Sequence, residues 1–254
     1  MKKRLYFVIC MFVLLVLTGC GEQTAEKSET ITEKMNQDKV VQLDKVDISH
    51  LTDDNVIRDE SQPSFAYSGQ TVDDVYSHSD LIVQGKVSDT YFTTIDGMAY
   101  TVMEFEVEDV LKGNAEKNST ITTLTLGGYT TLREHIEAND DAFRFADISE
   151  DKWDTTYLES YTLKDGYPKK GEKYVLALVD DSTFVKGVYS TLNIYEGMFK
   201  YDNGQYRRTL PEQNYYGNKK KADKTYFQND TAFQYKWFKE KCNEIKTKIG
   251  RAHV

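Results

Sequence analysis

Residues 100–110 read Tyr100-Thr-Val-Met-Glu-Phe-Glu-Val-Glu-Asp-Val110 and alternate apolar with acidic side chains over most of their length. Successive side chains of a β-strand point to opposite faces, so this period of two predicts a strand with one apolar and one wet face. Met103, Phe105 and Val107 would form the apolar face. Lys112-Gly-Asn114 then ends the strand as a turn. We therefore expect a sheet that packs one of its faces on a core.

Shorter segments around this strand carry related patterns. We expect further strands at residues 81–87, 120–126, 174–179, 190–194, 198–201 and 205–208. Gly85 indicates a bulge or a tight bend inside the first of them. Residues 174–179 are apolar on both faces, which is typical of a central strand. The last two strands flank Asp202-Asn-Gly204, a strong hairpin signal.

Three segments are expected to be helical. Residues 71–79 begin at Thr71, whose side chain can accept a hydrogen bond from a free backbone N–H of the first turn. Residues 131–138 form a second short helix. The tail of the chain places Phe238 and Cys242 on one apolar stripe with Lys and Glu around it, which predicts an amphipathic C-terminal helix.

Short strands, turn residues between them and helices at the ends predict a mostly β or α+β domain. Four phrases resemble those of uncharacterised bacterial exported lipoproteins. They are Asp80-Leu-Ile-Val-Gln-Gly-Lys-Val87, Val107-Glu-Asp-Val-Leu-Lys-Gly113, Leu126-Gly-Gly128 and Gly171-Glu-Lys-Tyr-Val-Leu-Ala-Leu178. The resemblance covers residues 78–200 and implies a small OB-like β-barrel with short flanking helices and the C-terminal amphipathic helix. It brings no catalytic residues.

The N-terminus has the parts of a secretory signal: a basic start at Met1-Lys-Lys-Arg4, an apolar run over residues 5–17, and small residues before Cys20. The run is too short for a spanning helix, which needs about 20 residues. Leu17-Thr-Gly-Cys20 resembles the lipobox of bacterial lipoproteins, which implies cleavage before Cys20 and lipidation of its thiol. We expect a lipid anchor on the extracytoplasmic face of the cell membrane.

These signals divide the chain into four parts. Residues 1–19 are the expected signal peptide. Residues 20–64 would be the lipidated cysteine and a disordered tether, because they are polar, charged and poor in apolar side chains. A β-rich globular domain is expected over residues 65–248. Residues 249–254 resemble the translation of a sequencing adapter and are left out of the expected fold.

The net charge argues against a nucleic-acid partner, and the cysteines argue against a disulfide. Removal of residues 1–19 takes away three basic residues and no acid, so the formal net charge falls from −9 to −12. Nucleic acid is not an expected partner, because phosphate contacts need clustered Lys and Arg. Cys10 would leave with the signal and Cys20 would be lipidated. Cys242 then has no partner, and no disulfide is expected.

An irregular segment at residues 139–170 is both acidic and aromatic, and such a long excursion from a compact domain is usually functional or partly helical. Its acidic residues are weak calcium candidates without the spacing of an EF-hand loop: Asp140, Asp141, Asp147 and Asp151. Its rings offer stiff contact area for a ligand, although each of them could instead fill the core: Phe143, Phe145, Trp153, Tyr157 and Tyr161.

Catalytic signals are weak. His78 and His135 lie outside any nucleophile-elbow motif, and the predicted apolar setting of Cys242 favours a buried structural thiol. Pairs of Asp and Glu are too numerous for any one pair to indicate a hydrolase. We therefore expect neither enzymatic activity nor a cofactor.

The expected function is binding: a monomeric, lipid-anchored protein of the bacterial envelope that meets an envelope protein, a peptide or a wall glycan through residues 139–165 and the adjacent loops. Two alternatives stay open. One is an envelope hydrolase that uses acidic residues or calcium, and the other is an OB-like protease inhibitor. The sequence identifies no ligand.

Overall fold

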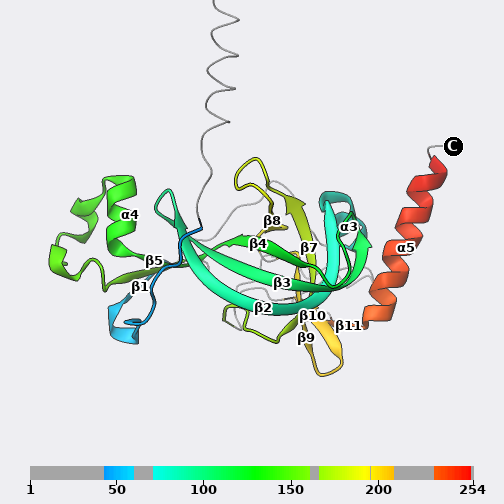
Figure 1. The fold of residues 1–254 in the computed structure, drawn as a ribbon, viewed down its shortest axis with the longest axis horizontal. Coiled ribbons are helices and arrows are strands. Elements are labelled where there is room, and N and C mark those ends of the chain that lie inside the picture. Colours follow the sequence, from blue (N-terminus) through cyan, green and yellow to red (C-terminus); the bar gives the residue numbers. More distant parts are fainter. Residues whose placement is uncertain (1–42, 60–70, 161–165, 195, 209–231, 253–254) are drawn as a thin grey trace, which may run out of the picture. The chain divides into compact units, whose positions relative to one another are not determined.

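A computed structural model describes residues 43–59, 71–160, 166–194, 196–208 and 232–252. These residues form a mostly β structure with a few helices and a C-terminal helix, which confirms the coarse fold class (Figure 1). The strands form a three-stranded sheet in the order β1-β6-β5 and an eight-stranded sheet in the order β11-β10-β9-β7-β2-β3-β4-β8.

The longest feature is a hairpin of β2 (Leu81–Ile95) and β3 (Met98–Lys112). It confirms both predicted strands, adds a second half to the strand predicted at residues 81–87, and extends the strand predicted at residues 100–110 by two residues at each end. The turn consists of Asp96 and Gly97, both with positive φ. Register shifts at Gly85 and after Val87 bend β2, and the Gly85 irregularity confirms the predicted bulge. The second shift displaces the alternation of inward and outward side chains in the residues that follow. The end of β2 therefore does not continue the period of two in the sequence.

Five strands of the larger sheet pair in a cycle. β7 (Lys173–Asp180) pairs with β2 along one edge, and β3 pairs with β4 (Thr120–Leu126). β8 (Val188–Thr191) runs parallel to β4 and antiparallel to the second half of β7, which returns the pairing to its start. β7 is fully buried over most of its length, as predicted for a central strand. β8 begins two residues before the predicted strand and ends at Thr191, where a turn follows.

The predicted hairpin near residue 200 is confirmed. β9 (Met198–Asp202) and β10 (Gln205–Arg208) pair across Asn203 and Gly204, both with positive φ. β9 continues the sheet from β7, and β11 (Ala232–Phe233) pairs with β10 at the edge.

Both short helices are capped by threonine. In α3 (Val72–His78), the hydroxyl of Thr71 accepts a hydrogen bond from the N–H of Asp74 at 3.0 Å, which confirms the predicted N-cap. In α4 (Leu132–Asn139), the hydroxyl of Thr131 accepts a hydrogen bond from the N–H of Glu134, and the Glu134 carboxylate accepts one from the N–H of Thr131, each at 3.2 Å.

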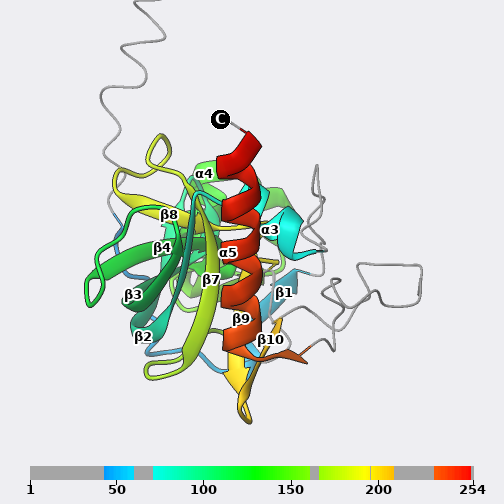
Figure 2. The same cartoon turned by 90° about the vertical axis from the view of Figure 1, so that its right-hand side faces the viewer.

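The predicted C-terminal helix is α5 (Tyr235–Ala252). Its stripe of Phe238 and Cys242 is buried, and Phe238 packs on Phe233 and Phe199 with ring centroids 5.0 and 5.8 Å away. Figure 2 shows α5 lying beside α3. The helix continues through residues 249–252, so the segment that resembles an adapter translation is helical as far as it is described. None of the helices in the described ranges is long and apolar enough to cross a membrane.

Residues 43–59 belong to the folded domain, which corrects the boundary expected at residue 65. The N–H of Val46 donates to the carbonyl of Phe92 at 2.8 Å, and the segment leads through η1 (Asp53–Asn55) into β1 (Val56–Asp59). β1 pairs in parallel with β6 (Tyr157–Ser160). The segment has few apolar residues, so its sequence does not indicate a folded structure. Its backbone is instead held by pairing with a strand that is distant in the chain. Cys20, the expected signal peptide and the rest of the expected tether lie outside the described residues.

Cys242 is expected to be unreactive in the native protein. It is a free, buried thiol, and burial raises its pKa to about 12. At about pH 8 the thiolate is then outnumbered by the thiol by about four orders of magnitude. Iodoacetamide should modify Cys242 only after unfolding, and mass spectrometry of the digested chain would locate the adduct. Rapid modification of Cys242 under native conditions would contradict this burial.

The attachment of α5 to the sheet is expected to weaken in acid. The carboxylate of Asp109 in β3 accepts hydrogen bonds from Tyr235, at 2.7 Å, and from Lys239. Burial by itself raises the pKa of Asp109, but these two bonds outweigh it and hold the pKa below the ordinary value of 3.8. Because the native pKa is the lower one, the stabilisation is complete above the unfolded pKa and is lost as the pH falls through the native pKa.

Asp109→Asn should therefore lower the free energy of unfolding at about pH 7, and its difference from the unchanged chain should shrink below about pH 3.8. Urea denaturation followed at both pH values measures the two differences. A difference that stays the same in acid would show that the ionised carboxylate does not hold α5.

Candidate ligand site

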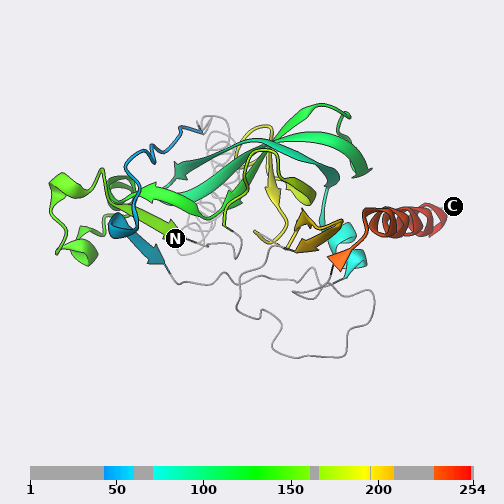
Figure 3. The ribbon, with the colours of Figure 1, turned by 90° about the horizontal axis from the view of Figure 1, so that it is seen from below.

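A cavity of about 280 Å³ lies where the β2–β3 turn meets α4, the segment after it and the three-stranded sheet. This volume is just below the range of about 300–1,000 Å³ that is typical of small-ligand sites. Figure 3 shows α4 and the segment after it, in green, beside β1, in blue. The cavity therefore lies against part of the acidic and aromatic segment that the sequence indicated.

The floor of the cavity is one face of the three-stranded sheet, which β5 (Gly128–Thr131) completes. Pairing places Ile57 beside Leu158 and Leu158 beside Thr130, and all three residues line the cavity. Because side chains alternate along a strand, their neighbours Arg58, Glu159 and Tyr129 share the opposite face.

The opposite face carries a buried carboxylate. Glu159 accepts hydrogen bonds from Arg58 Nε at 3.0 Å and from the hydroxyl of Tyr129 at 2.8 Å. Burial raises the pKa of Tyr129, and the bond to Glu159 raises it further. Tyr129 also meets the rings of Phe92 and Tyr167 edge-on. This satisfied network holds the small sheet on the hairpin and is a structural feature.

The polar wall of the cavity comes from α4 and η2 (Ala142–Phe145). His135 Nδ1 lies 3.0 Å from the carbonyl oxygen of Gly97, and its Nε2 lies 3.2 Å from Asp141 Oδ2. Both neighbours are acceptors, so both contacts are hydrogen bonds only when the ring carries two protons. The same Asp141 oxygen accepts from Arg144 Nη1 at 3.2 Å. One carboxylate oxygen thus serves two basic side chains that line the cavity.

The turn of the hairpin is fitted closely to α4. Gly97 has a φ of +74°, and a Cβ added there would lie 2.4 Å from Asn139 Nδ2 and 2.7 Å from Ala138 Cβ. Only glycine combines this backbone angle with this approach. The fit brings the Gly97 carbonyl to His135 and the neighbouring Met98 to the rim of the cavity.

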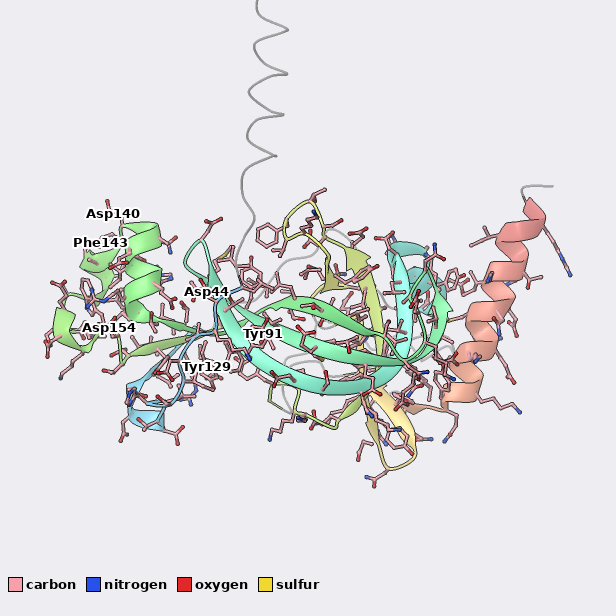
Figure 4. All side chains as sticks on the ribbon, in the orientation of Figure 1. Asp44, Tyr91, Tyr129, Asp140, Phe143 and Asp154 are labelled. Atoms are coloured by element: carbon pink, nitrogen blue, oxygen red, sulfur yellow. The ribbon has the colours of Figure 1, made fainter. Side chains whose placement is uncertain are left out.

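The apolar part of the cavity is partly open to solvent. Phe145 lines it and meets the His135 ring edge-on, with centroids 5.9 Å apart. Met98 is 47% exposed, and Phe143 in η2 is 78% exposed. Figure 4 shows Phe143 on the outer part of the segment near Asp140. Exposed aromatic and Met side chains next to an Arg are typical of binding surfaces.

The structure separates the predicted aromatic residues. Tyr157 is fully buried and its hydroxyl donates to the carbonyl of Asp47 at 2.8 Å, so its prediction as a binding residue is wrong. Trp153 is half-buried in its own loop, where its Nε1 donates to the carbonyl of Ile148. Phe145 lines the cavity and Phe143 lies near it on the surface. Tyr161 lies outside the described residues.

The four calcium candidates do not converge. Asp140 is the left-handed C-cap of α4, and Asp147 and Asp151 are exposed on the segment beyond it. Asp141 is buried and already bound by His135 and Arg144, two basic groups that compete with a cation. In the ranges that the structure describes, no three His, Cys, Asp or Glu side chains form a group that could hold a metal ion.

Sequence reasoning missed the three residues that join at the cavity: Gly97, His135 and Arg144. His135 lies on a predicted helix outside any nucleophile-elbow motif, and Arg144 carries no signal of its own. Asp96-Gly97 is a hairpin dipeptide that would have extended both predicted strands to the turn. Even then, nothing in the spacing of Gly97 and His135 would have placed the turn against α4.

Comparisons with protein-family models, curated proteins and solved structures find no match for this chain.

Proposed function

We propose that this protein is a lipid-anchored binding module of the bacterial envelope, and that the cavity between the β2–β3 turn and α4 is its ligand site. The observation that carries the proposal is the lining of this cavity. It combines apolar side chains (Ile57, Leu158 and Phe145) with two basic ones (His135 and Arg144) on regular elements. Convergent polar groups in an apolar pocket are the usual form of a binding site.

The strand pairing supports an OB-like barrel as the scaffold. The cycle β7–β2–β3–β4–β8 has the number of strands of an OB-fold. OB barrels bind ligands through a strand face and adjacent loops, one of them the loop between the first two strands. The corresponding loop here is Asp96-Gly97, which meets α4 beside the cavity.

The lining favours binding over acid catalysis. No Asp or Glu is found among the described residues that line the cavity. The cavity therefore does not supply the pair of convergent carboxylates that a glycoside hydrolase needs. Arg144 instead provides hydrogen-bond donors that Asp141 does not use, and these suit recognition of a negatively charged or carbonyl-bearing ligand.

The anchor is tested by Cys20→Ser. The variant should lose incorporation of labelled palmitate and leave the membrane fraction of the source bacterium, because one thiol would carry the attachment. Fractionation of cells that express either form measures this. Unchanged membrane association of the variant would contradict the lipid anchor.

The binding site is tested by photo-crosslinking in the same cells. A photoreactive phenylalanine analogue at Phe143 lies near the cavity, and a matched probe at Tyr201 lies on the β9–β10 hairpin with 44% exposure. We expect discrete adducts from position 143 that position 201 does not give. Adding Phe145→Ala should abolish them. The same adducts from both positions, or none from position 143, would contradict the proposed site.

A further inference from the structure

The geometry points to the ligand class: the cavity receives the carboxyl-terminal residue of a peptide, with the terminal carboxylate on Arg144 and an apolar side chain against Phe145, Leu158 and Ile57. The inference rests on the proposed function and specifies its ligand. It is drawn from the charge, the lining and the size of the cavity.

Asp141 joins the two basic side chains of the polar wall. This carboxylate is only 8% exposed, and its Oδ2 contacts both His135 and Arg144. Its Oδ1 is buried without a hydrogen-bond partner. The Asp141 carboxylate therefore uses one N–H of Arg144 and leaves the other donors of this cationic guanidinium for a ligand. An incoming carboxylate would accept from those donors, because charge-assisted hydrogen bonds are the strong ones.

Arg144 is the group free to make that contact. Its side chain is 61% exposed, and one of its five N–H donors is used by Asp141. Arg58 also borders the cavity, but its side chain lies on the opposite face of the sheet, where Glu159 holds it at 3.0 Å and Asp53 at 3.4 Å. A planar guanidinium that keeps adjacent donors can bind a carboxylate through two parallel hydrogen bonds.

The apolar lining and the volume specify the rest of the ligand. About 280 Å³ holds a residue or two and excludes a folded partner. Ile57, Leu158 and Phe145 provide a wall for an aliphatic side chain. A chain terminus carries its carboxylate on the same carbon as its side chain, so both enter the cavity together.

A second cavity allows the peptide to continue. It has a volume of about 390 Å³, shares Ile57 with the first, and is lined by polar residues that include Asn55, Lys152 and Thr155. The residues before the terminus would lie there along β1, where backbone and polar side chains offer hydrogen-bond partners. The inference therefore concerns a peptide end and not a free amino acid.

The test is a titration of the ¹⁵N-labelled full chain in mild detergent, followed by ¹H–¹⁵N spectra. The probes are N-acetyl-Gly-Leu with a free carboxylate, the same peptide as its amide, and N-acetyl-Asp-Leu amide, whose acid is internal. We expect the free carboxylate to shift the amides of Gly97, His135 and Phe145, with a Kd in the millimolar range suited to so small a ligand. The amide should bind at least tenfold more weakly, and the internal acid should not replace the terminus.

Arg144→Gln should weaken binding of the free-carboxylate peptide to the level of its amide and leave the affinity for the amide unchanged. Lys186→Gln, which removes the same charge from the β7–β8 loop, is the matched control and should change neither. If acid and amide bind the cavity equally, the carboxylate inference is overturned and the binding site stands. If the internal acid binds as well as the terminal one, the inference of a peptide end is overturned. If no probe shifts the cavity residues, the peptide inference is overturned, and the crosslinks from position 143 decide separately whether the proposed site stands.

Discussion

Phe238→Ala is expected to lower the free energy of unfolding by about 4 kcal/mol, the largest effect of any truncation in α5. The Phe238 ring is fully buried between the helix and the sheet, and it stacks on Phe233 with an interplanar angle of 24°. Cys242 and Val75 of α3 belong to the same buried cluster, so the ring joins both helices to β9. Its removal loses the free energy of transferring the ring from water into the core. It also leaves a cavity that two helices and a sheet cannot close.

The matched control is Phe143→Ala, the same substitution at a ring that is 78% exposed. It should change stability by no more than about 0.5 kcal/mol. Urea denaturation of both variants, followed by far-ultraviolet circular dichroism, gives the two values. Equal effects of the two substitutions would contradict the packing of α5 on the sheet.

Gly85→Ala is expected to cost about 3 kcal/mol, because the added methyl group meets backbone that has no room to move. A Cβ at Gly85 would lie 2.0 Å from the carbonyl oxygen of Glu106 and 2.8 Å from the ring of Phe105. The first contact is to the partner strand of the hairpin, so relief requires β2 and β3 to separate at the bulge. Those strands carry much of the buried core.

The control for Gly85 is Gly250→Ala in α5, where the added methyl group meets no atom within 4 Å. In a helix this change should stabilise the protein by up to about 1 kcal/mol. Thermal unfolding of the two variants compares them directly. A Gly85→Ala protein as stable as the unchanged chain would show that the bulge does not bring the strands as close as described.

Elements with a strong local signal were predictable. The capping threonines Thr71 and Thr131 mark their helices through a hydrogen bond to the third residue on, which is encoded within four residues of sequence. The hairpin at Asn203-Gly204 is equally local. The buried stripe of α5 follows from spacing alone. In each of these cases, the interactions that decide the structure lie close together in the chain.

The three-stranded sheet was not predictable, because its interactions are distant. β1 and β6 have four residues each and pair over a separation of about 100 residues, so neither has enough length to show a period. Tyr157 is a residue type that is common at binding sites. Its hydroxyl instead donates a hydrogen bond to the carbonyl of Asp47, in a segment expected to be a tether. Tertiary context, which no local pattern carries, decided its role.

The candidate site was predicted in part. The acidic and aromatic segment was identified as the place to search, and Phe145 lines the cavity there. The two basic residues, His135 and Arg144, were not predicted to form a site, because neither belongs to a sequence motif that indicates binding. They become a pair only when Asp141 is buried between them and Gly97 approaches α4.

The central claim is that the cavity between the β2–β3 turn and α4 binds an envelope ligand. The most direct test is hydrogen exchange of the full chain in detergent, with and without peptide fragments released from the envelope of the source bacterium. We expect slower exchange in α4, η2 and the turn at Asp96-Gly97, and no change in the β9–β10 hairpin. Slower exchange confined to other segments, or unchanged exchange throughout, would contradict it.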